Sequence, residues 1–168
     1  SITATATAVQ IDDAVDGTSV VTLEKVVAAG ATGGIHAVGA FSGKLTVTGG
    51  SVSATGAGGV VFDATVGGTV HLTTVDVTGG AGDGMSVGGA LTGTLEVVGT
   101  TVSATGGNGV TLAALTGAAV TLRGGSVTGS AAALKITGAA DVATRVRLAG
   151  TVASATTDHA VRAVGAFD

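Results

Sequence analysis

The chain has 168 residues, of which 31 are Gly and none is Pro, Cys, Trp or Tyr, and its formal net charge is −4. This length favours a single domain over residues 1–168, and the lack of cysteine excludes disulfides and the common zinc sites. The acidic charge and the 2% content of aromatic residues argue against nucleic-acid binding, and Gly, Ser and Thr interrupt every apolar run before the ~18 residues of a membrane span.

Short segments in which apolar and polar residues alternate follow one another along the chain, with the two-residue period of a half-buried β-strand. In chain order they begin with 2–4, 9–11 and 21–23, and each kind then recurs about every 25 residues. The first series comprises 9–11, 35–37, 60–62, 85–87, 110–112, 134–136 and 161–163. The second comprises 21–23, 45–47, 70–72, 95–97, 120–122 and 146–148. The third comprises 2–4, 52–54, 75–77, 102–104 and 127–129, with irregular versions at 26–27 and 152–155.

The connectors between these segments are too short to hold a crossover helix. Each strand must therefore pair in parallel with its equivalent one turn later. The pattern predicts an all-β, single-domain, right-handed parallel β-helix (solenoid) of about seven coils of ~25 residues, with three short strands per coil. The alternation points the apolar residues of 60–62, 85–87 and 110–112 inward, in stacked rows.

The repeated unit resembles a known group of proteins. It is represented by Gly109-Val110-Thr111-Leu112, then Ala119-Val120-Thr121-Leu122, then Ser126-Val127-Thr128. This pattern resembles the right-handed parallel β-helix of bacterial surface and secreted proteins, above all autotransporter passengers and large adhesins. The resemblance covers essentially the whole chain, and it implies an extracellular or cell-surface location. The same fold also carries polysaccharide lyases, tailspikes and structural shafts, so it does not by itself define an activity.

Outward hydroxyl pairs mark the third series as a candidate binding face. Residues i and i+2 lie ~6.7 Å apart and coils ~4.8 Å apart, so the hydroxyls would form a flat lattice, which resembles the ice-binding faces of β-solenoid antifreeze proteins. In this interpretation Asp76 and Thr78 align with Ser53 and Thr55. The alternative is that Thr is simply a good strand residue whose ladders stabilise the face. The candidate residues are Thr3, Thr5, Ser53, Thr55, Thr78, Ser103, Thr105, Thr128, Ser130, Ser154 and Thr156.

Asp12, Asp13 and Asp16 form the one acidic cluster of the sequence. Their oxygens are of the kind that binds Ca²⁺, but their spacing does not match a calcium-binding loop, and a solvated turn is the simpler interpretation. We therefore expect neither a metal nor a cofactor.

The histidines could serve catalysis only with suitable partners. His71 and Glu96 are 25 residues apart, so we expect them to be neighbours on adjacent coils, joined by a surface hydrogen bond or ion pair. His36 and His159 have no acidic or nucleophilic partner at a motif spacing, and we expect them to be surface residues.

Charge is distributed unevenly along the chain. Residues 1–100 carry eight acids and two bases, whereas residues 101–168 carry three acids and five bases. The sequence also shows no cap for either end of the predicted solenoid, which suggests a segment of a longer solenoid or a subunit that stacks. The expected partners are thus flanking coils of a longer chain or other copies arranged head to tail, with neither nucleic acid nor a membrane span involved.

These observations favour a non-enzymatic structural segment of a bacterial surface or secreted protein: a stalk, an adhesin shaft or a filament subunit. The alternative from another class is a module that binds ice or a glycan through the flat Thr/Ser face. A carbohydrate-active enzyme is a third hypothesis, which the lack of an outward carboxylate cluster disfavours. A designed or consensus solenoid would produce the same pattern.

Overall fold

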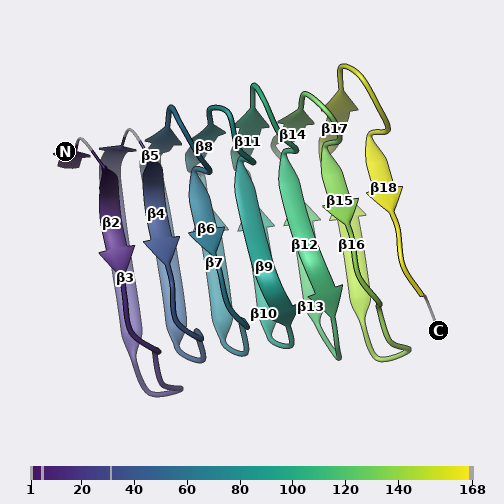
Figure 1. The fold of residues 1–168 in the computed structure, drawn as a ribbon, viewed down its shortest axis with the longest axis horizontal. Helices are drawn as coiled ribbons and strands as arrows, with labels where there is room; N and C mark the ends of the chain where they lie inside the picture. The colour runs from purple at the N-terminus through teal and green to yellow at the C-terminus, as the bar shows by residue number, and fades with distance from the viewer. Residues whose placement is uncertain (1, 5, 31, 167–168) are drawn as a thin grey trace.

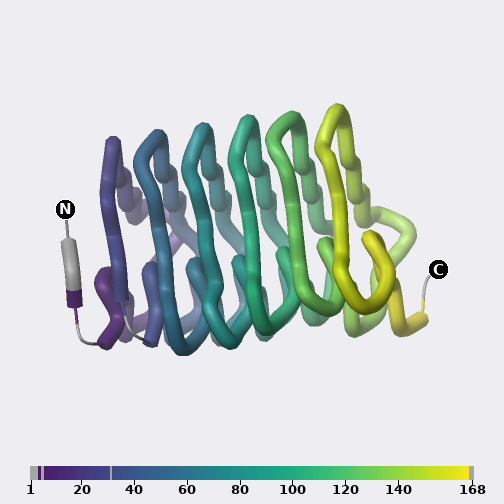
Figure 2. The backbone as a smooth tube through the Cα atoms, turned by 90° about the horizontal axis from the view of Figure 1, so that it is seen from above, coloured from purple at the N-terminus to yellow at the C-terminus, as the bar shows by residue number. Residues whose placement is uncertain are grey.

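The computed structural model describes residues 2–4, 6–30 and 32–166, which form a right-handed parallel β-solenoid. In Figure 1 the nearer strands run downward and the farther strands run upward while the chain advances from left to right, which is right-handed winding. The first and last coils lie at opposite ends of the axis (Figure 2). All pairs of named strands are parallel, as the repeat predicts.

Strands of the first series build a seven-stranded sheet, which we call the first face. Its order along the axis follows the order in the chain. The strands are β2 (Thr7–Ile11), β4 (Gly33–Ala37), β6 (Val60–Phe62), β9 (Met85–Leu91), β12 (Val110–Leu115), β15 (Leu134–Ile136) and β18 (Val161–Ala163).

An eleven-stranded sheet forms the other two sides of the coil. β3 (Val20–Gly30) and β5 (Lys44–Ala54) are long strands that run along both sides without interruption. The second face is completed by β7 (Thr69–Thr73), β10 (Thr94–Val98), β13 (Ala119–Arg123) and β16 (Arg145–Ala149). The third face is completed by β1 (Ile2–Ala4), β8 (Asp76–Gly79), β11 (Thr101–Ala104), β14 (Ser126–Gly129) and β17 (Val152–Ala155).

At least one residue with positive φ turns the chain from the second face to the third in every complete coil. Gly49, Gly99, Gly124 and Gly150 serve this purpose in four coils, with φ between +57° and +66°, and in two of these the next residue, Gly50 or Gly125, has a positive φ as well. Lys25 and Thr74 occupy the same position in the remaining two, with φ of 49° and 51°. The left-handed conformation is costly for residues with a Cβ and most of all for β-branched ones, which explains why glycine predominates here.

The inward side chains stack in rows along the axis and form one apolar core. The residues that the alternation placed inward on the first face are all at most 1% exposed: Val60, Phe62, Met85, Val87, Val110 and Leu112. Phe41, at the corner between the first and second faces, packs edge-on against Phe62 with ring centroids 5.5 Å apart. The prediction of the core is therefore confirmed.

The described chain makes six complete coils, preceded by β1 and followed by β18, which roughly matches the expected count of about seven. Two third-face segments differ from expectation. In the first coil residues 28–30, not 26–27, pair with 52–54. In the third coil Val77, not Val75, pairs with Val52. The segment predicted at 75–77 was thus placed two residues too early, and β8 begins at Asp76.

No helix occurs in the part of the chain that the structure describes, so none there could cross a membrane.

Candidate functional site

One unbroken row of hydroxyls runs along the third face. Ser53, Thr78, Ser103, Thr128 and Ser154 are successive register partners on five adjacent strands. Adjacent parallel strands lie about 4.8 Å apart, so the row has the regular spacing that the sequence predicted.

Several hydroxyls of this row bond to one another or to the adjacent coil. The Ser103 hydroxyl donates to Thr78 Oγ1 at 3.3 Å and lies 3.5 Å from the Val77 carbonyl oxygen. Thr128 Oγ1 and Ser154 Oγ are 3.2 Å apart. These side chains therefore join one coil to the next as well as facing outward.

A second row lies just beyond the strands, where the chain turns toward the first face. It contains Thr55, Thr105, Ser130 and Thr156, but Gly80 occupies its position in the third coil. The Thr105 hydroxyl donates to the Gly80 carbonyl at 2.9 Å. The Thr156 hydroxyl donates to the Ser130 carbonyl at the same distance. This row is interrupted, and the hydroxyls of Thr105 and Thr156 bind the backbone of the preceding coil.

The remaining members of the predicted face lie elsewhere. Asp76 pairs with Ser51 and Thr101, not with Ser53, so the predicted alignment of Asp76-x-Thr78 with Ser53-x-Thr55 was wrong by two residues. Thr3 pairs with Ala29, and Ala29 pairs with Ser53, so an alanine separates Thr3 from the unbroken row. Thr5 and the side chain of Thr3 lie outside the described residues.

The acidic cluster is a turn in which one carboxylate binds local donors. Asp16 Oδ1 accepts hydrogen bonds from the Thr18 N–H at 2.9 Å and the Thr18 hydroxyl at 2.7 Å, and from the N–H and hydroxyl of Ser19 at 3.0 Å each. The Thr18 hydroxyl foremost, with the other donors, lowers the pKa of Asp16 below its ordinary value. Asp12 accepts a hydrogen bond from Gln10.

Across the described residues, no three His, Asp or Glu side chains converge on a point that could hold a metal ion. Asp12, Asp13 and Asp16 therefore do not form the shared site that Ca²⁺ would need.

Each histidine lies beside a carboxylate. His71 and Glu96 are register partners on the second face, with 3.8 Å between Nε2 and Oε2, as expected. The other two side chains reach the surface, as expected, but each has a carboxylate neighbour that the sequence analysis missed. His36 Nε2 is 2.7 Å from Asp63 Oδ2, and His159 contacts Asp158. The His36 pair was missed because it is diagonal: Asp63 lies one coil onward and two residues further along.

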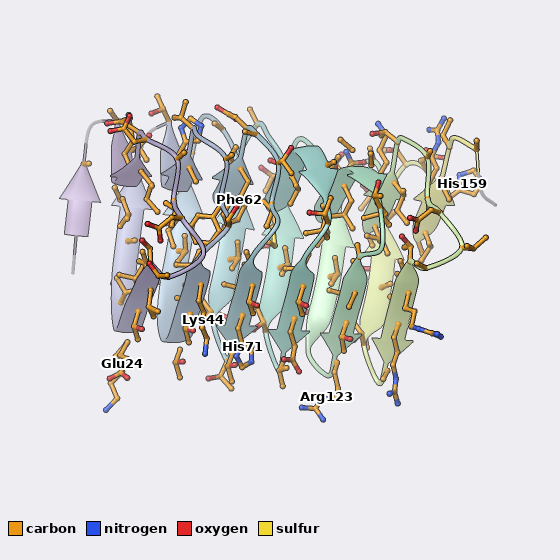
Figure 3. The ribbon with its side chains drawn as sticks, turned by 90° about the horizontal axis from the view of Figure 1, so that it is seen from below. Glu24, Lys44, Phe62, His71, Arg123 and His159 are labelled. Atoms are coloured by element: carbon orange, nitrogen blue, oxygen red, sulfur yellow. The ribbon has the colours of Figure 1, made fainter. Side chains whose placement is uncertain are left out.

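Charged side chains accompany the histidine on the second face. Figure 3 shows Glu24, Lys44, His71 and Arg123 along one edge of the solenoid. They are separated along the axis, each on a different strand. This spacing suits solvated charges on a wet sheet better than a converging catalytic group.

A polar ladder near the turn into the first face was not anticipated. Asn108 is only 9% exposed. Its backbone N–H and its side-chain Nδ2 both donate to Asp83 Oδ1, at 2.7 and 3.0 Å, and its Oδ1 accepts from the Ala132 N–H at 3.2 Å. The ladder thus joins three coils. Its signal in the sequence is an Asx residue just before Gly84 and again, 25 residues later, before Gly109.

A second set of buried contacts ties the corners together. Thr100, 1% exposed, donates to the carbonyl of Val98 at 3.1 Å and to that of Leu72 in the preceding coil at 3.4 Å. Thr151 repeats the arrangement two coils later, donating to the Leu122 carbonyl at 2.9 Å. These hydroxyls satisfy carbonyls where the sheet bends.

The chain matches no protein-family model, no curated protein and no solved structure. Its architecture defines its class: it is a parallel β-solenoid repeat protein.

Proposed function

We propose that this chain is a non-enzymatic structural segment of a bacterial surface or secreted protein, serving as a stalk, an adhesin shaft or a filament subunit. The proposal is supported by the hydrogen-bond partners of the polar side chains. The hydroxyls of Thr105, Thr156 and Thr151 and the amide of Asn108 all bind groups on a neighbouring coil. Polar groups used in this way strengthen a stack of coils and do not converge on a ligand.

The core is less covered in the last complete coil than in the inner coils. Leu148 in the last complete coil is 39% exposed, whereas its register partner Leu122 is 1% exposed. An uncovered core edge of this kind favours the addition of another strand. In the proposed role the ends are covered by flanking coils of a longer chain or by other copies placed head to tail.

Replacement of a bonded hydroxyl and of a matched unbonded one tests the structural role. Thr105→Val removes the bond to Gly80, and we expect a melting temperature a few degrees lower, from a loss of about 1 kcal/mol. Thr121→Val is the control, because Thr121 is half-buried on β13 and its hydroxyl bonds to none of the described residues. Equal effects of the two changes would contradict a stacking role for the Thr105 hydroxyl.

A second candidate is a module that binds ice or a glycan, favoured by the unbroken row from Ser53 to Ser154. It predicts inhibition of ice recrystallisation or retention on a glycan array by the unaltered protein. Thr55→Tyr together with Thr105→Tyr should then abolish the activity while the circular dichroism spectrum is kept, because bulky rings disrupt a flat lattice. Activity in either assay would overturn the purely structural proposal, and inactivity in both would remove the alternative.

A further inference from the structure

Three arginines project outward from two adjacent strands of the second face. Arg123 lies on β13, where it points away from the ribbon (Figure 3), and Arg145 and Arg147 lie on β16, which pairs with β13. All three side chains are exposed, and they are three of the seven Lys and Arg residues of the chain. The whole chain has a net charge of −4, so these residues, which we call the arginine patch, form a local basic area on an acidic molecule.

The guanidinium groups of the arginine patch make no hydrogen bond or ion pair with any described residue. Arg162 on the first face differs, because its guanidinium lies 2.6 Å from Asp158. The strand on the other side of β13 carries one carboxylate, Glu96, and its Oε2 lies 3.8 Å from Nε2 of His71, one strand further from the patch. Asp141, at the corner before β16, accepts the N–H of Gly117. The patch therefore keeps its capacity to bind an external anion.

The three charges are spread over the sheet and do not converge. Arg145 and Arg147 are two residues apart on one strand, about 6.7 Å, and Arg123 is a diagonal neighbour of Arg147, about 8 Å away. The register partners of Arg145 and Arg123 are Ala119 and Ala149, whose small side chains leave room beside the guanidinium groups. This arrangement suits an extended ligand with separated negative charges better than a single small anion.

Unbonded hydroxyls continue the same surface along the axis. Thr46, Thr69, Thr94 and Thr121 point outward on four adjacent strands of the second face, and their hydroxyls bond to none of the described residues. On the third face, by contrast, hydroxyls such as that of Thr105 bind the neighbouring coil. The second face thus presents hydrogen-bonding groups that the stack of coils does not use.

We propose that the second face binds an acidic polysaccharide, whose carboxylates pair with the arginine patch and whose hydroxyls bond to the outward threonines. A guanidinium presents parallel N–H donors that match a carboxylate. The proposal goes beyond the structural role, because a shaft with this surface would also hold a polymer. The surface is distinct from the hydroxyl row between Ser53 and Ser154 on the third face.

Other polyanions fit this surface less well. β7, β10, β13 and β16 carry no aromatic residue on which the bases of a nucleic acid could stack. Val98 is their one large outward apolar residue, which is too little to enter the boundary of a lipid bilayer. A polymer of hydroxyls and separated carboxylates needs neither feature.

The contacts are exposed, and this determines how the surface should behave. Exposed ion pairs are individually weak and are screened by salt, so binding requires several of them together and should be lost as the salt concentration rises. The arginines project from the face and not along the axis. A coil stacked against β16 would therefore lie beside Arg145 and Arg147 and leave them uncovered.

Alginate, a linear polyuronate, is the probe, with neutral dextran as the comparison, and biolayer interferometry at low salt measures the binding. Arg123→Gln together with Arg147→Gln should weaken binding to alginate about tenfold. The matched control is Arg162→Gln, which removes a charge of the same kind from the first face and should leave the affinity unchanged. Thr121→Val removes one unbonded hydroxyl beside the patch and should weaken binding about threefold.

Circular dichroism melts should show that the variants keep the fold, since every altered side chain points outward. The proposal is overturned if alginate is not bound, if Arg162→Gln weakens binding as much as the double change, or if Thr121→Val has no effect. Tighter binding of oligothymidylate or of phosphatidylserine vesicles than of alginate would also overturn it, by assigning the patch to a nucleic acid or a membrane. Binding should persist in Thr55→Tyr with Thr105→Tyr, and its loss there would move the site to the third face. Failure of the proposal leaves the stacking role intact, which Thr105→Val tests separately.

Discussion

Truncation of one leucine in an inner coil and of its neighbour in the last coil measures how much stability depends on stacking. Leu122 and Leu148 are register partners in the same inward row, and they are 1% and 39% exposed. Leu→Ala removes three carbons, worth about 2.4 kcal/mol at ~0.8 kcal/mol each when fully buried. The cavity left at Leu122 raises the expected loss to about 3–5 kcal/mol.

At Leu148 only about 60% of the side chain is removed from water, so the transfer loss falls to about 1.5 kcal/mol. No closed cavity forms there, because the last complete coil is open on one side. For a chain of this length 1 kcal/mol shifts the melting temperature by about 2–4 °C. We therefore expect a drop of about 6–20 °C for Leu122→Ala and about 3–6 °C for Leu148→Ala.

Far-UV circular dichroism is the suitable readout, because the chain has no Trp or Tyr for fluorescence. Both variants should be melted at a low protein concentration, so that association does not cover the last coil. Equal losses at Leu122 and Leu148 would refute the argument, since they would mean that the two positions are equally buried in solution.

Three further changes test other parts of the stack. Leu95→Asp should prevent folding, because the carboxylate would be buried between Val70 and Val120 with no partner. A cooperative melt near that of the unaltered protein would contradict the strand register. Asn108→Ala should lower the melting temperature by several degrees, because the partners of its side chain lose their hydrogen bonds, and an unchanged melt would show the ladder to be dispensable. The Gly117 N–H foremost, with Thr144, lowers the pKa of Asp141 in the folded protein. The ionised Asp141 therefore stabilises the fold above about pH 4, the pKa in the unfolded chain, and this contribution is lost as the pH falls through the lower folded pKa. Asp141→Asn should thus make the melting temperature fall less steeply below about pH 4, and an unchanged slope would contradict this.

Most of the strand positions could be predicted because alternation and a near-constant period act together. A shift of one residue would turn every apolar side chain outward, so the alternation excludes strand registers that are wrong by one residue. It does not exclude a register that is wrong by two residues. Val75 and Val77 both fit an inward position, and this ambiguity produced the wrong alignment in the third coil.

The corner residues explain why the ambiguity arose in that coil. Gly49, Gly99, Gly124 and Gly150 mark the turn between the second and third faces. Lys25 and Thr74 make the same turn without the residue type that normally indicates it. The sequence around these two positions therefore gives no turn signal. The third-face segments that follow them, in β3 and in the third coil, are the ones whose position was predicted wrongly.

The hydroxyl row could be predicted from strand spacing, but the bonds of its members could not. Whether Thr105 faces a ligand or the Gly80 carbonyl depends on a side-chain torsion, which no pattern of residue types determines. The diagonal contact between His36 and Asp63 was missed for a related reason. A search at one coil length finds partners directly opposite, such as His71 and Glu96, and overlooks those displaced along the strand.

The constant distance between paired strands has a consequence for how the chain folds. Strands that pair are separated by about one coil, as between Val110 and Met85, whichever part of the molecule they occupy. Adding coils therefore lengthens the molecule without lengthening any loop that must close, so the entropy of each closure stays the same. Folding can start in one coil pair and spread in both directions, each finished edge acting as the template for the next strand. A version with twice as many coils should have a similar barrier to nucleation and simply take longer to complete.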